Sequence, residues 1–493
     1  MKKIFAILML ICMLASALCV SAFAADEPAA GVVLRVSALE NDSGDTVVIK
    51  DYTDFEEGWE AAIDLALDKE AMEKYTRVVV DFYADWKADD DGEFGNSWDG
   101  FSHYTICVPD EVKITLNLGG HTINRNLKKS ESDGEVIYID EDADVIINDG
   151  TIKGGKSDNG AGGIHVHGAD LTLNNVHIVG NVADNDDGGG IALYDGANLV
   201  MNGGSFKDNV LDGFGFALCY GGAVYITEGS NASFHGVEFK NNQAVNREAL
   251  GTAIYVENGN VYLSECTFDG NGVEDEDNKI YAGVSVIHGI NSTIKIEKTT
   301  FTNNGSIYAD PDFVWNGYEG EGVQSSIIHA ENSTLTIKKE SMFTNNSPCA
   351  LIYCLDGSEI YVSYSTFKDN KAAVICSYGQ HTNDSYFKNC SFNNNKMPYV
   401  YESYYLEHSF AVSSTSIWIS DCDLGDSTFK NTHFIGFFNT SAPDGVGSIF
   451  GEGSLTMVVA IAALIVSVAS ILVSVSSKKN KTSSSETTTE DRK

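Results

Sequence analysis

Three aromatic residues recur at one position of a repeated segment and are suited to binding sugars. Tyr361, Tyr386 and Trp418 each stand second in a strand-like segment, just before an apolar residue. Side chains alternate between the two faces of a strand, so the second place points away from the first and third. Because aromatic rings pack well against apolar surfaces, we expect an exposed ridge that binds a glycan or a partner protein.

The longest insertion between two repeats brings further aromatic residues close to this ridge. Residues 305–325 carry Trp315 and Tyr318 together with several acidic side chains. We expect the insertion to flank the ridge and to add these two residues to the ligand-binding site. The alternative for all of these rings is that they only fix loops onto the body of the protein.

Two histidines and two acidic runs have the residue types that bind metals. His165 and His167 are two residues apart, so their side chains leave the same face of a strand and can share an ion. No third ligand of clear type stands nearby, and the runs 184–187 and 274–277 lack the EF-hand spacing. The sequence therefore predicts no metal site and no cofactor; calcium fits the carboxylates, but no spacing specifies it.

The charge balance bears on the function classes. The chain has 32 Lys and Arg residues against 70 Asp and Glu, a net charge of −38, which disfavours nucleic acid as a partner. Polysaccharide-cleaving enzymes need converging carboxylates, and no outward acid pair with a basic partner stands out in successive repeats. The catalytic residues are therefore unknown, and a polysaccharide lyase or glycoside hydrolase is the alternative to a binding protein.

Both ends of the chain predict an exported and anchored protein. Residues 1–24 have the basic, apolar and small-residue order of a signal peptide. Residues 454–477 are predicted to form a transmembrane helix, and the lysines that follow place the tail 478–493 inside. We expect a single-pass protein of the cytoplasmic membrane, with its body outside at the cell surface.

A repeated frame of about eleven residues decides the fold class. The segment 199–209, LVMNGGSFKDN, has apolar residues at places one, three and eight and Asn at place eleven, and about eleven copies follow one another at intervals of 25 to 41 residues. Such a period is typical of a solenoid, and the alternation within each copy indicates strands. The first, third and eighth places should form inward ladders, and the second and fourth should be exposed. The final Asn should be a turn residue that tolerates left-handed backbone and hydrogen-bonds its stacked neighbour.

Glycine pairs mark a second strand in each repeat and carry a resemblance. They precede Ile164, Ile191 and Ala223. With the F-x-x-N motif they make the chain resemble right-handed parallel β-helix proteins of the pectate-lyase-like superfamily, and especially the repeats of chlamydial polymorphic membrane proteins. The resemblance covers roughly residues 114–434. It implies the fold, not a function.

The predicted fold class is therefore all-β, a right-handed parallel β-helix of about eleven rungs with a capping helix before it and the transmembrane helix after it. The cap region is 25–113, with an amphipathic helix from about Phe55 to Lys74 that begins at a capping box, 53–56. The β-helix is 114–434, and a linker, 435–453, leads to the membrane.

The cysteines are predicted to be thiols more often than disulfides. Cys354 and Cys376, and likewise Cys390 and Cys422, are expected at matching places in adjacent rungs. Stacked places lie about 4.8 Å apart, near the lower limit for a disulfide.

We expect a cell-surface binding or adhesion module for carbohydrate or a partner protein, of unknown oligomeric state. A structural spacer that only holds distance from the membrane is the second alternative, after the enzyme. An enzyme needs a groove with converging carboxylates, a binding module needs only the aromatic ridge, and a spacer needs neither.

Overall fold

The protein forms two units, Met1–Arg247 and Glu248–Lys493. The computed structural model describes residues 28–88, 106–213, 219–245, 249–272, 280–281, 285–305, 325–348, 350–355, 357–377, 385–395, 416–423, 425 and 434–438. The signal peptide, the transmembrane segment and the tail predicted above lie outside these residues. Within the part described, no helix is long and apolar enough to cross a membrane.

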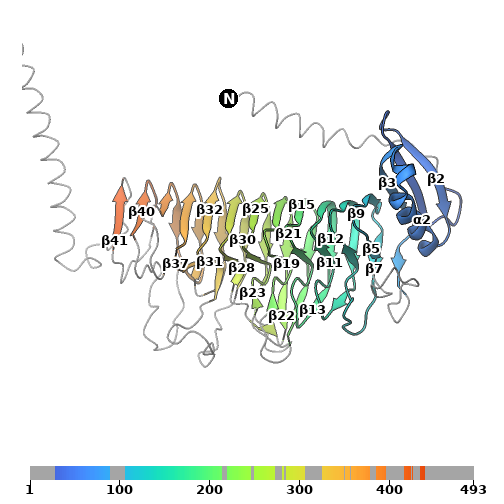
Figure 1. Ribbon diagram of the computed structural model, residues 1–493. Helices are drawn as coiled ribbons and strands as arrows, with labels where there is room; N and C mark the ends of the chain where they lie inside the picture. Colours follow the sequence, from blue (N-terminus) through green and yellow to red (C-terminus); the bar gives the residue numbers. More distant parts are fainter. Residues whose placement is uncertain are drawn as a thin grey trace, which may run out of the picture. The chain divides into compact units, whose positions relative to one another are not determined.

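The first unit is a stack of short parallel strands arranged in three sheets (Figure 1). Sheet A contains β6 (Lys113–Asn117), β7 (Thr122–Asn124), β9 (Asp144–Lys153), β12 (Asp170–Val179), β15 (Asn198–Asn202), β16 (Ser205–Lys207), β20 (Asn231–His235) and β21 (Glu238–Lys240). Sheet B contains β5 (Ile106–Val108), β8 (Ile137–Ile139), β11 (Ile164–His167), β14 (Ile191–Tyr194) and β19 (Val224–Ile226). Sheet C contains β10 (Lys156–Ser157), β13 (Val182–Asp184), β17 (Val210–Asp212) and β22 (Gln243–Val245), and β18 (Cys219–Tyr220) is a short extra strand.

The second unit is built from the same kind of short parallel strands. Its sheet A contains β25 (Asn260–Ser264), β26 (Thr267–Asp269), β29 (Thr293–Glu297), β30 (Thr300–Thr302), β32 (Thr334–Lys338), β33 (Met342–Thr344), β35 (Glu359–Ser363), β36 (Thr366–Lys368), β38 (Tyr386–Lys388), β39 (Ser391–Asn393), β40 (Ser416–Ser420) and β41 (Phe434–Phe438). Its sheet B contains β24 (Ile254–Glu257), β28 (Ser285–Ile290), β31 (Ser326–Glu331), β34 (Ala350–Cys354) and β37 (Ala373–Ser377). Two short strands, β23 (Ala249–Leu250) and β27 (Ile280–Tyr281), complete the described elements. The strand β41 pairs with β40 and ends four residues after the predicted end of the coil at 434.

The predicted inward ladders are confirmed. Place three of the frame is fully buried in every rung from Met201 to Ile419, and so is the phenylalanine column at place eight. In the second unit Phe343 stacks on Phe301 with ring centroids 4.6 Å apart and on Phe367 at 4.9 Å. In the first unit Phe206 stacks on Phe239 at 5.1 Å. Parallel pairing in register therefore places the same residue type above itself along each core.

The asparagine column forms the predicted hydrogen bonds between stacked neighbours, but the predicted left-handed backbone is wrong for it. In each turn, the residue with left-handed backbone is the one before the repeated Asn, such as Asp208 (φ 54°) or Asn303 (φ 57°). Asn304 itself is fully buried, because its side chain turns inward to hydrogen-bond the neighbouring rungs. Its Nδ2 donates to the Phe268 carbonyl at 2.9 Å and to Asn346 Oδ1 at 3.1 Å, and its Oδ1 accepts from the Asn271 backbone N–H at 3.0 Å.

The glycine pairs stand where backbones of successive turns approach closely. A Cβ on Gly163 would lie 2.2 Å from the Gly190 carbonyl oxygen, and one on Gly190 would lie 2.5 Å from that of Ala223. A side chain at either place would force the rungs apart. The strands of sheet B begin directly after these glycines, as predicted.

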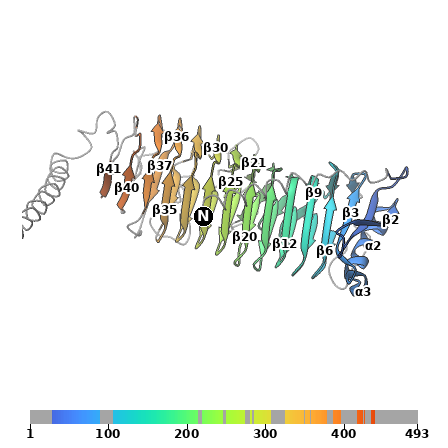
Figure 2. The same ribbon diagram turned by 90° about the horizontal axis from the view of Figure 1, so that it is seen from above.

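The N-terminal cap is a small antiparallel sheet with a helix packed on it (Figure 2). Strand β1 (Leu34–Glu40) pairs with β2 (Thr46–Tyr52) and with β3 (Tyr75–Phe82), and β3 joins the coil by pairing parallel with β6. The short strand β4 (Trp86–Lys87) pairs with β7. The helix predicted from Phe55 to Lys74 is divided into α2 (Phe55–Leu67) and α3 (Lys69–Met72), because Asp68 ends the first and caps the second.

The predicted capping box, 53–56, is shifted by one residue. Asp54 is the N-cap, and its carboxylate accepts a hydrogen bond from the Glu57 backbone N–H at 3.0 Å. The helix, predicted to be amphipathic, buries Trp59 and Ile63, whereas Leu67 is exposed. Phe55 instead stacks on Trp86 of β4 with ring centroids 4.9 Å apart.

The two predicted cysteine pairs have different outcomes. Cys390 and Cys422 are adjacent free thiols, and the Cys390 backbone N–H donates to the Cys422 sulfur at 3.3 Å. The pairing of Cys354 with Cys376 is wrong by one residue, because Cys354 pairs with Ser377 and Cys376 pairs with Tyr353. A shift of one residue moves a side chain to the opposite face of its strand.

The asparagine column should contribute strongly to stability. We expect Asn304→Ala to lower the free energy of unfolding by about 2–4 kcal/mol, because it leaves buried donors and acceptors of two neighbouring rungs unsatisfied. Asn393→Ala, at an exposed place of β39, is the matched control and should change stability by less than about 0.5 kcal/mol. Chemical denaturation of both variants checks this, and equal effects would contradict it.

Candidate functional site

The predicted aromatic ridge lies on the outer face of sheet A in the second unit. Strand pairing places the second position of successive rungs in one column, which consists of Tyr262, Lys295, Thr336, Tyr361, Tyr386 and Trp418. Tyr361 points outward because its neighbours in the strand, Ile360 and Val362, are buried in the core, and Tyr386 is exposed. The register of the three predicted residues is therefore as expected from the repeat.

Two of the predicted ridge residues have described side chains. The ring centroids of Tyr361 and Tyr386 are 5.4 Å apart, with the ring planes tilted by 52°. Tyr386 is 37% exposed, and the Tyr361 hydroxyl donates to Glu359 Oε2 at 2.9 Å. Tyr361 is half-buried. The structure describes Trp418 only as a position of β40, and Trp315 and Tyr318 lie outside the described residues.

The same column in the first unit has a different character. It consists of Thr115, Ile146, Thr172, Val200 and Ser233. Two places further along these strands, Asn117, Asn148, Asn174 and Asn202 donate hydrogen bonds to one another in series. Aromatic and charged side chains therefore distinguish the outer face of sheet A in the second unit.

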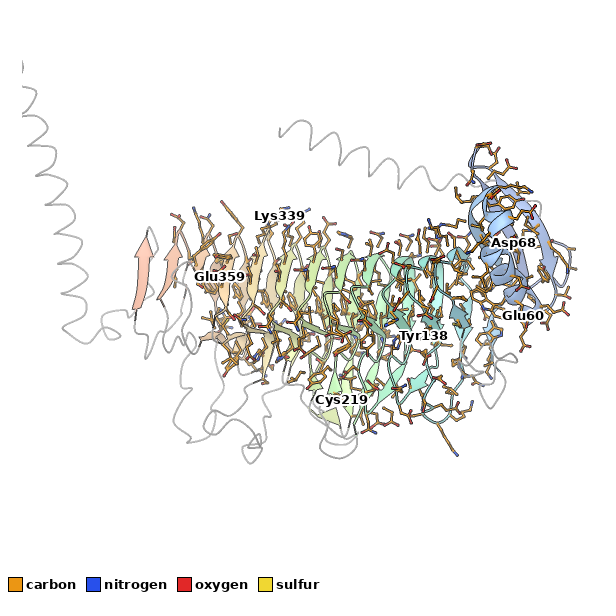
Figure 3. The ribbon with its side chains drawn as sticks, viewed as in Figure 1. Glu60, Asp68, Tyr138, Cys219, Lys339 and Glu359 are labelled. Carbon is orange, nitrogen blue, oxygen red and sulfur yellow. The ribbon has the colours of Figure 1, made fainter. Side chains whose placement is uncertain are left out.

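A lysine cluster beside the ridge was missed by sequence reasoning. Glu297, at the fourth place of its frame, is 3% exposed although the frame predicts an exposed residue there. Lys295 lies 3.6 Å and Lys338 3.1 Å from its Oε1, and Lys339 binds its Oε2. The Tyr262 hydroxyl also donates to Oε2 at 3.1 Å. We call the three lysines around Glu297 the lysine cluster. Figure 3 shows Lys339 at the edge of the strands.

The electrostatics of Glu297 follow from this arrangement. Burial alone would raise the pKa of its carboxyl. Hydrogen bonds from Lys339 and Lys338, together with their charges, outweigh burial and lower the pKa to about 2. Lys295 also lies over the Tyr262 ring, with its Nζ 4.8 Å from the ring centroid. The carboxylate is therefore ionised at neutral pH and holds the ammonium groups in fixed places.

The predicted histidine pair does not form a shared site in the first unit. His165 lies between Tyr138 and Tyr194, with ring centroids 4.9 and 4.8 Å away. Burial, with a smaller effect of the His167 charge, lowers the pKa of His165 to about 4. His167 instead faces carboxylates. Among the residues that the structure describes, no group of three or more His, Cys, Asp or Glu side chains could hold a metal ion.

An acidic row follows the sheet B strands of the first unit. His167 Nδ1 lies 3.5 Å from Asp140 and 3.6 Å from Glu141, and its Nε2 contacts Asp195. Burial, together with the charge and a hydrogen bond of Asp140, raises the pKa of Asp110. Sequence reasoning missed this row because its members come from four separate rungs. It provides neighbouring carboxyl groups, among them Asp110 with its raised pKa, near an imidazole.

The outer face of sheet B in the second unit carries a buried stack of imidazole rings. His288 and His329 stack with ring centroids 4.0 Å apart, between Tyr255 at 5.6 Å and Tyr353 at 5.0 Å. His288 and His329 are 3% and 4% exposed. Burial lowers the pKa of His329 to about 3. These histidines are therefore neutral at physiological pH.

Comparison with known families identifies the coil. A family model described as the right handed beta helix region matches residues 113–289 and again 223–434. The matched residues agree closely with the range 114–434 predicted from the repeat. No curated protein and no solved structure matches the chain.

The buried imidazole stack should make the protein sensitive to acid. The folded-state pKa of His329, about 3, lies below its ordinary value of 6.5. The unfolded chain therefore binds the proton first, and stability falls as the pH drops from 6.5 toward 3. We expect a loss of up to about 2 kcal/mol between pH 7 and pH 5 from this residue.

Denaturation midpoints of the native protein and of His329→Phe, measured at pH 7 and pH 5, check this expectation. The variant keeps a ring in the stack and should lose part of the pH dependence. Tyr353→Phe, which changes a ring of the same stack without removing an imidazole, is the control and should keep the native slope. An unchanged slope in His329→Phe would contradict the expectation.

Proposed function

This chain belongs to the family of right-handed β-helix proteins, and we propose that it is a cell-surface module that binds glycans along the outer face of sheet A in the second unit. Export by the signal peptide and anchoring by the apolar segment 454–477 are part of the proposal. They rest on the order of charged and apolar residues at the two ends of the chain.

The observation that carries the proposal is the column of outward residues. Tyr361 and Tyr386 pair in register, and Trp418 takes the next place. Neighbouring rungs are about 4.8 Å apart, so the column presents a regular row of ring surfaces to a partner. A row of this kind suits an extended polymer that crosses several rungs better than a compact small molecule.

Hydrogen-bonding groups stand next to the rings, as sugar hydroxyls require. Glu359 holds the Tyr361 hydroxyl, and the lysine cluster begins two rungs away at Lys295. Trp315 and Tyr318 enter the proposal through the length and composition of their insertion. A glycan bound here would contact apolar ring surface and polar side chains on one continuous face.

A second candidate function rests on the acidic row of the first unit. Glycoside hydrolases use two carboxyl groups of which one is protonated, and Asp110 has a raised pKa beside Asp140. His167 contacts Asp140 and adds a group that can carry a proton. If this row cleaves polysaccharide, the full-length protein should release reducing ends, and Asp140→Asn should abolish the release. Absence of release from every bound glycan would remove this candidate.

The binding proposal is tested by removing the ridge. We expect the triple variant Tyr361→Ala, Tyr386→Ala, Trp418→Ala of the full-length protein to lose at least tenfold in affinity on a glycan array, because each lost ring contact costs about 1 kcal/mol. The thermal denaturation midpoint should change little, since outward residues do not support the core.

Tyr364→Ala is the matched control. This tyrosine is 59% exposed on the turn after β35 and lies outside the column. Its loss should change affinity by less than about twofold. Equal retention of the native protein and the triple variant on every glycan would exclude the ridge and favour the structural spacer.

A further inference from the structure

We propose that the lysine cluster around Glu297 binds anionic groups of the ligand, so that the recognised glycan is an acidic one carrying carboxylate, sulfate or phosphate. The inference rests on the proposed glycan-binding function and names the class of ligand. It opposes the expectation from net charge alone, because a chain of −38 repels polyanions at long range.

The charges of the cluster do not balance. Lys295, Lys338 and Lys339 surround a single carboxylate, that of Glu297. The contacting side chains alone, three ammonium groups and one carboxylate, carry an excess of two positive charges; around them, Lys298 interacts with Glu265, Glu340 and Glu297. An anion that settles there relieves the repulsion between the lysines.

The ammonium groups also keep donors free for a ligand. Each ammonium group has three N–H donors, and Glu297 accepts one hydrogen bond or ion pair from each lysine. The side chains of Lys295, Lys338 and Lys339 are 44%, 34% and 55% exposed, whereas Glu297 is almost fully buried. The surface that a ligand meets is therefore positive, and the negative group lies beneath it.

Neutralising Glu297 does not by itself require three lysines. Other lysines of the second unit pair with one carboxylate each: Lys298, next to Glu297 in the chain, lies 2.8 Å from Glu265, and Lys368 lies 3.6 Å from Asp369. In the cluster, Glu297 acts as an anchor that fixes the positions of several cations. Fixed cations bind an anion with less loss of side-chain freedom than mobile ones.

The cluster is continuous with the ridge. Lys295 and Lys338 belong to β29 and β32, and Tyr361 and Tyr386 belong to the next strands of the same face, β35 and β38. One polymer crossing these strands would meet the cations first and the rings next. The geometry thus combines charge recognition and ring contact in a single path.

The test compares matched polymers that differ only in charge. The probes are a polyuronate against its methyl ester, dextran sulfate against dextran, and poly(glycerol phosphate) against polyglycerol, each titrated into the full-length protein at constant ionic strength. We expect at least one charged form to bind tenfold or more tightly than its neutral partner. The three pairs distinguish carboxylate, sulfate and phosphate as the group recognised.

The chain offers a closely matched pair of variants. Lys339 and Lys298 are 55% and 54% exposed, each contacts a carboxylate, and each loses one charge on replacement by Gln. Lys339→Gln should weaken binding of the charged polymer about tenfold, the effect of one charge-assisted contact. Lys298→Gln should change it less than twofold, and Lys339→Arg should retain most of the native affinity. Lys338→Gln provides a second variant if Lys339→Gln is unstable.

The outcomes separate this inference from the proposed function. If neutral and charged partners bind equally, or if Lys339→Gln and Lys298→Gln behave alike, the anionic-ligand inference is overturned. In that case, weaker glycan binding by the triple variant Tyr361→Ala, Tyr386→Ala, Trp418→Ala would still support glycan recognition. If the native protein binds none of the polymers and no glycan on the array, both ideas fail. Preference for an acidic protein over every charged glycan would also overturn the inference.

Discussion

The fold depends on hydrogen bonding between identical positions of successive rungs. Asn304 connects three rungs through its side-chain amide, and the same arrangement recurs at Asn346 and Asn370. A buried amide without partners is costly, so these contacts require parallel strands in register. Once register is set, every place in a rung lies above the same place in the next. The buried columns build the coil, and the outward columns are left free for binding.

Stacking in register also constrains what an outward column can carry. Like charges placed in one column, about 4.8 Å apart, repel one another. The first unit avoids this with a column of neutral amides, Asn117 to Asn202, that bond to each other. The second unit gathers lysines from β29, β32 and the turn after β32 around a buried carboxylate, Glu297. A positive patch on this acidic coil therefore depends on one buried anion.

Alternation within one rung was enough to predict the coil and the outward register of Tyr361 and Tyr386. It could not predict the lysine cluster, because Lys338 and Lys339 meet Glu297 only across a rung that contains an insertion. The acidic row was not predicted for a similar reason. Asp110 and Asp140 follow sheet B strands, whose sequence does not repeat at a strict interval. Cys376 was misplaced by one residue on the same sheet. Contacts between rungs need the exact register, which a pattern read along one rung does not contain.

In the second unit, the ionisable side chains of sheet B and sheet A differ in exposure. On sheet B, His288 and His329 are buried, and burial lowers the pKa of both so that they are uncharged at neutral pH. On sheet A, the lysines around Glu297 are partly exposed, and a buried carboxylate lies among them. Uncharged rings add to packing, whereas exposed cations remain available to a partner. The face that keeps its charge next to open tyrosine rings is therefore the one on which recognition of a charged polymer is physically favoured.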